Sequence, residues 1–243
     1  MNDRLPDIRA ARLARLRGLY AIADDSFAST PEALLSLVEA ALRGGALVVQ
    51  LRAKSLGASA LLAVARAAQS RCHDAGALLF INDRPDVAVL AGADGVHLGQ
   101  DDFPLIAARA IVGPDVLLGI STHSDAEIDA AVAAGADCIG FGPAFETSTK
   151  RATAPGAAAL PPAHGIEGVR RAVLRAGVVP LIAIGGIDSA RAEALAHAGA
   201  ACIAAISSLW LAPDPAAMSR TFVSAIARGE EKARLGRGAE EAS

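Results

Sequence analysis

Three polar side chains stand at alternate positions where one apolar stretch of the sequence ends: Gln50, Arg52 and Lys54. Because the side chains of an extended strand point alternately to its two faces, all three can share one direction. Arginine binds a phosphate through two parallel hydrogen bonds, and lysine acts as a point charge. Lysine occurs at only three positions, and two of them, Lys54 and Lys150, stand in candidate loops. The pattern therefore favours an anion-binding site over a solvated loop.

Carboxylates close two further apolar stretches. Asn82-Asp83 ends one of them, and such a pair by itself is more typical of a turn or a helix cap. The next stretch is followed by Asp102, so Asp83 and Asp102 leave neighbouring predicted strands. Together they could hold one Mg²⁺, a hard cation that takes few carboxylates beside water and substrate phosphates. His97 lies within the strand pattern itself, and we interpret it as a core histidine.

Hydroxyl groups follow the next strand ends. Ser121 stands just beyond the fifth apolar run, where it could hydrogen-bond a ligand. The loop 142–150 carries Thr147, Thr149 and Lys150, which would suit an anion. As a bare pattern this loop is a weak signal, because Ser and Thr occur in ordinary loops.

Paired glycines and serines follow the last two apolar runs, at Gly185-Gly186 and Ser207-Ser208. Glycines let the backbone approach a phosphate closely, and barrels of alternating strands and helices often bind phosphate with these two loops. The sequence thus predicts two anionic subsites, one with the carboxylates and one with the late loops. It shows no Cys–His or Ser–His pairing that would indicate covalent catalysis.

The elements that must position these residues are short apolar runs separated by helical patterns. Several runs are continuously apolar, as parallel strands covered on both faces should be. The runs are Leu19–Ala23, Ala46–Leu51, Ala77–Ile81, Gly95–Leu98, Val116–Ile120, Cys138–Phe141, Pro180–Ile184 and Ala201–Ile206. A weak repeat, Ala-Gly-Ala-Asp at 91–94 and 134–137 and Ala-Gly-Ala-Ala at 198–201, leads into a strand each time.

Alternating strands and helices predict either a closed barrel or an open doubly wound sheet. No Gly-x-Gly-x-x-Gly follows the first strand, and polar residues gather at the strand ends instead. That distribution favours a single-domain (β/α)8 TIM barrel, whose sites lie at the carboxyl ends of the strands. We expect the barrel over residues 1–228 and a charged, frayed or disordered tail over 229–243.

Composition narrows the classes of function. The net charge of −3 gives no electrostatic footprint for nucleic acid. Three cysteines without metal spacing indicate core thiols in a reducing compartment, so we expect a cytoplasmic protein. The N-terminal charges have no apolar core behind them, so we expect no signal peptide. The segment 195–213 lacks charged residues but contains Ser, His, Gly and Pro, which favours a helix end and a buried strand over a membrane span. The sequence does not determine the oligomeric state, and a homo-oligomer is one possibility.

The ordered motifs resemble the thiamine-phosphate synthase family from about Leu19 to Ser208. They are Gln-Leu-Arg-x-Lys, Ile-Asn-Asp, Asp-Gly-Val-His-Leu-Gly-Gln-x-Asp, Gly-x-Ser-x-His, Thr-x-Thr-Lys and Ile-Gly-Gly-Ile. The resemblance implies a TIM barrel that makes thiamine phosphate from hydroxymethylpyrimidine diphosphate and a thiazole phosphate, with or without a carboxyl group. It also implies a Mg²⁺ cofactor and a dissociative reaction in which diphosphate leaves before the thiazole nitrogen attacks.

The roles of this family carry over to matching positions. Asp83 and Asp102 match the Mg²⁺ ligands. The pyrimidine diphosphate would be held by Gln50, Arg52, Lys54, Asn82, Ser121 and Lys150. The thiazole phosphate would be held by Thr147, Thr149, Gly186, Ile206 and Ser207. Within these sets the resemblance gives catalytic roles to Arg52, Lys54, Ser121 and Lys150.

The sequence departs from the family in one loop. Glu146 stands where the family usually has Pro, and Phe-Glu-Thr resembles the thiazole tautomerases, a sister family. The segment 151–164 is also longer than expected. A tautomerase needs no diphosphate site, so retention of the polar residues at 52, 54, 82, 83 and 102 argues against it. The remaining alternatives are another phosphate-handling barrel and a non-catalytic barrel that binds thiamine precursors.

Overall fold

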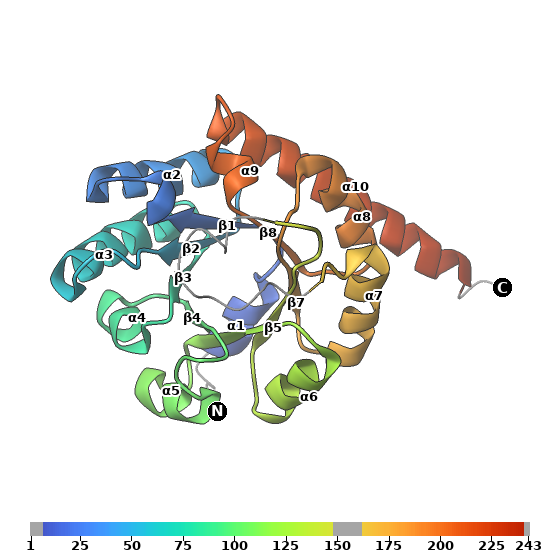
Figure 1. Ribbon diagram of the computed structural model, residues 1–243, viewed down its shortest axis with the longest axis horizontal. Helices are drawn as coiled ribbons and strands as arrows, with labels where there is room; N and C mark the ends of the chain where they lie inside the picture. The colour runs from blue at the N-terminus through green and yellow to red at the C-terminus, as the bar shows by residue number, and fades with distance from the viewer. Residues whose placement is uncertain (1–6, 148–161, 241–243) are drawn as a thin grey trace, which may run out of the picture.

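The computed structural model describes residues 7–147 and 162–240 of the chain. Eight parallel strands close into a barrel in sequence order, which confirms the predicted TIM barrel (Figure 1). The strands are β1 Gly18–Asp24, β2 Val48–Arg52, β3 Leu78–Asn82, β4 Gly95–Leu98, β5 Leu117–Thr122, β6 Cys138–Phe141, β7 Leu181–Ala183 and β8 Cys202–Ala205. All eight coincide with the predicted apolar runs to within a few residues.

Helices surround the barrel in a ring (Figure 1). They are α2 Pro31–Arg43, α3 Ala58–Asp74, α4 Pro85–Ala91, α5 Leu105–Val112, α6 Asp125–Ala133, α7 Gly165–Ala176, α8 Ser189–His197, α9 Ser207–Trp210 and α10 Pro215–Glu240. A helix α1, Ile8–Ala14, precedes the first strand, and a 3₁₀ turn, Asp25–Phe27, follows it.

Local capping explains where several helices begin. Thr30 accepts a hydrogen bond from the Ala33 N–H, with Pro31 at the first helical position. Ser124 accepts from the Glu127 N–H, and the Glu127 carboxylate accepts from the backbone N–H of His123. A capping box is therefore present, with its return bond displaced by one residue.

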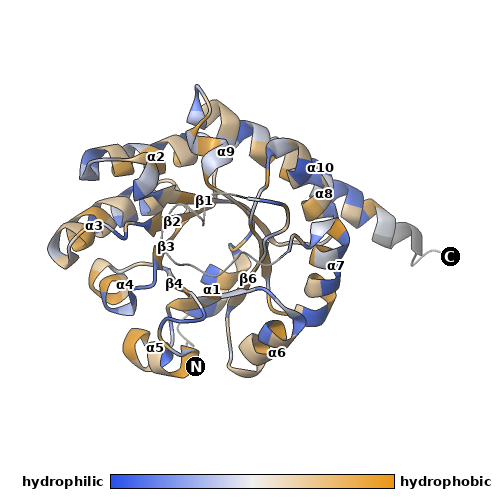
Figure 2. Cartoon of the chain, in the orientation of Figure 1, coloured by the Kyte–Doolittle hydropathy of each residue, from blue (hydrophilic) through white to orange (hydrophobic). Residues whose placement is uncertain are grey.

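Two apolar layers hold the fold together. One fills the barrel interior and includes Tyr20, Phe80 and Leu117, and the other packs the helices against the outside of the strands. Figure 2 shows mostly hydrophobic strands inside helices that mix hydrophobic and hydrophilic residues. Cys138 and Cys202 lie buried in the interior layer with free thiols, as predicted for core cysteines. Within the described residues, no helix is both long and apolar enough to cross a membrane.

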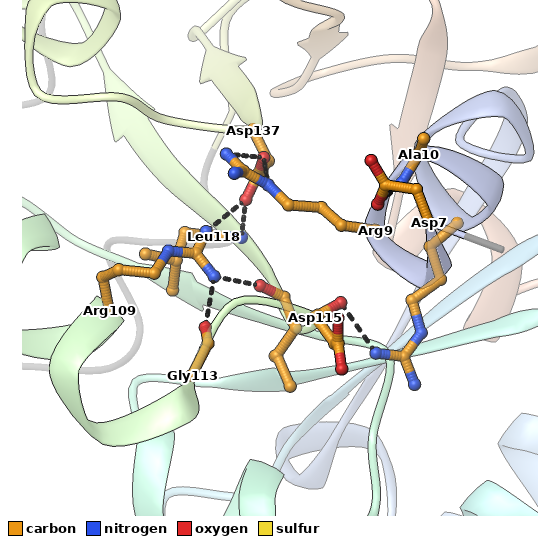
Figure 3. A network of polar contacts seen from close by, with 10 residues as sticks. Asp7, Arg9, Ala10, Arg109, Gly113, Asp115, Leu118 and Asp137 are labelled. Carbon is orange, nitrogen blue, oxygen red and sulfur yellow. Dashed lines mark hydrogen bonds and ion pairs between the residues drawn. The ribbon is translucent and has the colours of Figure 1, made fainter. Parts of the chain in front are cut away.

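Helix α1 closes the amino-terminal end of the barrel. Its Arg9 binds Asp137 and its Arg12 binds Asp94, at 2.6 and 2.9 Å. These two aspartates end the repeated Ala-Gly-Ala-Asp segments, and each also accepts a backbone N–H of the strand beside it. Figure 3 shows Arg9 and Arg109 converging on Asp137 beside Leu118. The repeat therefore supplies buried acceptors that tie α1 to the strands, which leaves the opposite end for ligands.

The carboxyl-terminal residues differ from the expected tail. Residues 229–240 continue α10, which packs along α8. Gly229 permits the close approach, because a Cβ there would lie 2.2 Å from the Glu193 carbonyl oxygen. Lys232 adds an ion pair to Glu193 at 2.5 Å. The charges that suggested a frayed segment thus lie on a continuous helix, and a domain boundary near residue 229 stays a prediction.

Asp137→Ala is expected to lower the free energy of unfolding by about 3 kcal/mol, because it leaves the Leu118 N–H and two arginines without their buried acceptor. Chemical denaturation followed by circular dichroism measures this change. Asp115→Ala is the matched control, since Asp115 is exposed and contributes its backbone carbonyl to Arg12. Equal stabilities of the two variants would contradict the role of Asp137.

Candidate functional site

The predicted site residues that the structure describes lie at the carboxyl ends of the strands, around the barrel mouth. A narrow cavity of about 70 Å³ enters the barrel there, and a wider one of about 540 Å³ adjoins it. The two cavities share the lining residues Ile184, Ala204 and Ile206. A ligand group in one cavity can therefore contact a group in the other.

The narrow cavity has a polar side and an apolar side. Its polar lining comes from β1 to β5 and consists of Tyr20, Asp24, Gln50, Arg52, Asn82, His97 and Ser121. Its apolar lining comes from β7 and β8 and the residues that follow them, Ile182, Ile184, Ala204 and Ile206. This shape suits a flat ring that has hydrogen-bonding atoms on one edge and is otherwise apolar.

His97 lies inside the barrel at this cavity, where its Nε2 is 3.1 Å from Ser121 Oγ. Space for its ring exists because residue 119 is glycine, since a Cβ there would lie 2.5 Å from His97 Nδ1. Our interpretation of His97 as a core residue was thus incomplete. It is one of the polar residues at the cavity, and it helps to position Ser121. Its inward place on β4, level with Asn82 on β3, is the signal that could have shown this.

A cluster of charges lies beside the narrow cavity. Lys54 Nζ is 2.9 Å from Asp83 Oδ2, and the side chains of Asp83 and Asp102 hydrogen-bond each other. The backbone N–H of Gly99 donates to Asp102 Oδ2 at 2.7 Å. The structure therefore brings together the two carboxylates predicted as metal ligands, with one predicted lysine.

The two carboxylates have different pKa values. Burial alone would raise the pKa of Asp83, but the hydrogen bonds with Asp102 and Lys54 and the charges of Lys54 and Arg52 hold it below its ordinary value. Burial, and then the hydrogen bond with Asp83, raise the pKa of Asp102 above its ordinary value. The two carboxylates therefore lie close enough together for one cation to bind both.

The donor set fits Mg²⁺. Two neighbouring carboxylates, Asp83 and Asp102, provide hard oxygen ligands. Within the described ranges, no cluster of three or more His, Cys, Asp or Glu side chains could hold a metal. Mg²⁺ suits such a site, because it usually keeps several waters and binds substrate phosphates.

Two aspartates that the sequence analysis missed hold the loop of Arg52 and Lys54. Asp24, at the end of β1, is 1% exposed and lies 2.5 Å from Arg52 Nη1. The carboxylate of Asp25 accepts from both the N–H and the hydroxyl of Ser55, at 2.7 and 2.6 Å. The signal was present, since Asp24-Asp25 closes an apolar run as Asn82-Asp83 does.

The wide cavity is lined by the loops after β6, β7 and β8. Gly186, Ile206, Ser207 and Thr147, all predicted for a phosphate ligand, lie there. Gly186 has φ +63°, and a Cβ would lie 2.4 Å from the Glu146 carbonyl oxygen, so this close loop contact requires glycine.

Arg191 joins two of these loops. Its guanidinium carbon lies 4.4 Å from the centre of the Phe145 ring, and its Nη1 donates to the Gly186 carbonyl at 2.8 Å. Thr149 and Lys150 lie outside the described residues, so their predicted roles stay predictions.

Comparisons with known proteins identify the family of this chain. The sequence pattern of the family described as thiamine monophosphate synthase matches residues 19–209. A thiamine-phosphate synthase of Anaeromyxobacter dehalogenans is 41% identical over 223 residues, which cover 91% of this chain and 93% of that protein. One of Thermosynechococcus vestitus is 42% identical over 222 residues, and the match spans 90% of this chain but 59% of that longer protein.

A solved structure is also similar. The thiamine phosphate pyrophosphorylase of Pyrococcus furiosus superposes with a TM-score of 0.77 at 30% identity, covering 89% of this chain and 98% of that one.

Asp24→Asn is expected to raise the Kd of Mg²⁺-diphosphate about tenfold, because Arg52 then loses the charged partner that fixes its guanidinium. Titration calorimetry with inorganic diphosphate and Mg²⁺ measures this affinity. Glu39→Gln is the matched control, since it changes a carboxylate in an exposed ion pair with Arg71. An Asp24→Asn protein that binds diphosphate as tightly as the control would contradict the role of Asp24.

Proposed function

This chain belongs to the thiamine monophosphate synthase family, and we propose that it is a transferase joining hydroxymethylpyrimidine diphosphate to a thiazole phosphate. The products would be thiamine phosphate and diphosphate. One observation carries the proposal: the charged cluster of Lys54, Asp83 and Asp102 follows strands β2 to β4, which line a small polar cavity, and this cavity adjoins a second one lined by a glycine loop.

The charged residues would bind the diphosphate as the leaving group. Arg52, oriented by Asp24, and Lys54, oriented by Asp83, place positive charge where negative charge develops. Lys150 would add a third cation. Asp83 and Asp102 would hold Mg²⁺, which supplies further stabilisation of the diphosphate charge when it is bound.

The narrow cavity would hold the pyrimidine ring. Gln50, Asn82 and Ser121 offer hydrogen bonds to the polar edge of the ring, and the isoleucines opposite keep water from its methylene carbon. The bond between that carbon and the diphosphate oxygen breaks, and its electron pair leaves with diphosphate. The lone pair of the thiazole nitrogen then forms the new carbon–nitrogen bond.

The wide cavity would hold the thiazole phosphate. Gly186 and Ser207 provide backbone and hydroxyl donors for the phosphate, and Thr147, with Thr149 beyond the described residues, would complete the site. Because both cavities share Ile184 and Ile206, the thiazole nitrogen can approach the methylene carbon directly.

A second candidate function is isomerisation of a thiazole phosphate, as in the tautomerases. It is favoured by Glu146, which lines the wide cavity. This isomerisation would not use the charged cluster of Lys54, Asp83 and Asp102, because it involves no diphosphate. A non-catalytic barrel that binds thiamine precursors would bind both substrates without turnover.

The coupling assay tests the proposed function. With both substrates and Mg²⁺, the purified protein is expected to form thiamine phosphate and diphosphate in equal amounts, and EDTA should remove the activity. Asp102→Ala should lower kcat by about 10²–10³-fold, the loss expected for one preorganised group that stabilises charge. Asp101→Ala, an exposed carboxylate beside it, is the matched control.

Normal turnover of Asp102→Ala would contradict the metal assignment. Absence of coupling by correctly folded protein would contradict the transferase. Isomerisation of the thiazole phosphate would then support the tautomerase, and binding alone would support the precursor-binding barrel.

Gly186→Ala is expected to raise the KM for the thiazole phosphate about tenfold or more, because a left-handed backbone and a 2.4 Å contact both oppose the methyl group. The KM for the pyrimidine diphosphate should change little. Gly92→Ala is the matched control, since Gly92 has φ +68° with nothing within 4 Å of its added carbon. Initial rates with each substrate varied in turn give both constants, and a matching rise in both KM values would contradict the separate thiazole site.

A further inference from the structure

A buried tyrosine that the proposed reaction does not use lies in the lining of the narrow cavity. Tyr20, on β1, is 1% exposed, and its ring lies 5.6 Å from that of Phe80, between centroids. Burial raises the pKa of Tyr20 well above its ordinary value, so the phenol stays neutral. Its hydroxyl makes one hydrogen bond with the described residues, donating to Gln50 Oε1 at 2.8 Å.

This bond is the first of a chain across three neighbouring strands. Gln50, itself 3% exposed, donates from Nε2 to Asn82 Oδ1, also at 2.8 Å. The chain runs from the barrel interior on β1, through β2, to the polar side of the narrow cavity on β3. Each amide orientation along it depends on the one before.

The surroundings of the phenol set the direction of the chain. In the reverse arrangement Gln50 would donate to the phenol oxygen, and the phenol proton would need another acceptor. The thiols of Cys138 and Cys202 share the buried cluster of the barrel interior with Tyr20, and a thiol is a weak acceptor. A buried donor without an acceptor is costly, so the phenol donates and the two amides follow.

We propose that Tyr20 is a positioning residue that makes the Gln50 and Asn82 part of the narrow cavity's polar edge a hydrogen-bond donor. Each amide oxygen already accepts one hydrogen bond within the chain, and the chain turns the Asn82 NH₂ and the second N–H of Gln50 toward other partners, so these donors remain for a ligand. Such an edge selects a ring that presents an unprotonated nitrogen, and it disfavours a tautomer that presents N–H. The proposal rests on the proposed function, which places the pyrimidine ring in this cavity.

Tyr20→Phe tests the proposal, because it removes one hydroxyl and keeps the packing of the ring. Steady-state rates are measured with the pyrimidine diphosphate and with two pyridine analogues, each with one ring nitrogen replaced by CH. The ratio of kcat/KM for substrate and analogue is compared between enzymes, so the intrinsic reactivity of each analogue cancels. Phe80→Leu is the control, since it changes the packing beside Tyr20 without touching the chain.

For one analogue, the ratio of kcat/KM for substrate to kcat/KM for analogue should be about tenfold larger in the wild type than in Tyr20→Phe. This difference is about the effect of one oriented hydrogen bond. Tyr20→Phe should also raise the KM for the pyrimidine diphosphate and leave that for the thiazole phosphate unchanged. Phe80→Leu should lower stability and keep the wild-type ratio. The same ratio in wild type and Tyr20→Phe, for both analogues, would overturn the proposal.

A readout without turnover separates this proposal from the proposed function. Side-chain amide NMR of the free protein should show the Gln50 and Asn82 NH₂ signals shifted in Tyr20→Phe. Unshifted signals would overturn the chain of hydrogen bonds even in an active enzyme. Shifted signals in a protein that performs no coupling would support the chain and contradict the transferase instead.

Discussion

Closure of eight parallel strands brings all their carboxyl ends to one mouth, and every assignment in this chain depends on that constraint. At the other end of the barrel, α1 places arginines on Asp94 and Asp137. The same aspartates bind backbone N–H groups of the strands, so these ion pairs and the strand pairing stabilise each other. These stabilising contacts lie at the amino-terminal end of the barrel. The residues at the mouth are therefore available to bind ligands.

Charge pairing explains how the mouth tolerates so many ionised groups. A charge removed from water is costly unless it is paired and hydrogen-bonded. Asp24 pairs with Arg52, and Asp83 pairs with Lys54 and shares a hydrogen bond with Asp102. These partners hold the cations in place before any ligand arrives, which is the preorganisation that electrostatic catalysis requires. The apolar side of the narrow cavity then keeps the dielectric low where a cation would form.

The strands, the barrel and the glycine loop could be predicted from the sequence, because continuous apolar runs, helix caps and paired glycines are local patterns. Contacts between strands could not. Asp24 binds Arg52, 28 residues away, and Tyr20 donates to Gln50, 30 residues away. Such contacts between strands leave no local pattern in the sequence. His97 looked like core because it lies in an apolar strand, although the glycine at 119 makes room for its ring beside the cavity. The charges near the carboxyl terminus suggested a tail. Arg228 and Lys232 instead lie on α10, and both form ion pairs with Glu193 on α8.

The most direct test of the central claim is a crystal structure of the protein with Mg²⁺, thiamine phosphate and diphosphate. The account predicts Mg²⁺ on Asp83 and Asp102, diphosphate against Arg52 and Lys54, and the pyrimidine ring between Asn82 and Ile184. It also predicts the phosphate of the thiazole part at Gly186. A pyrimidine ring outside the narrow cavity, or Mg²⁺ away from both carboxylates, would contradict it.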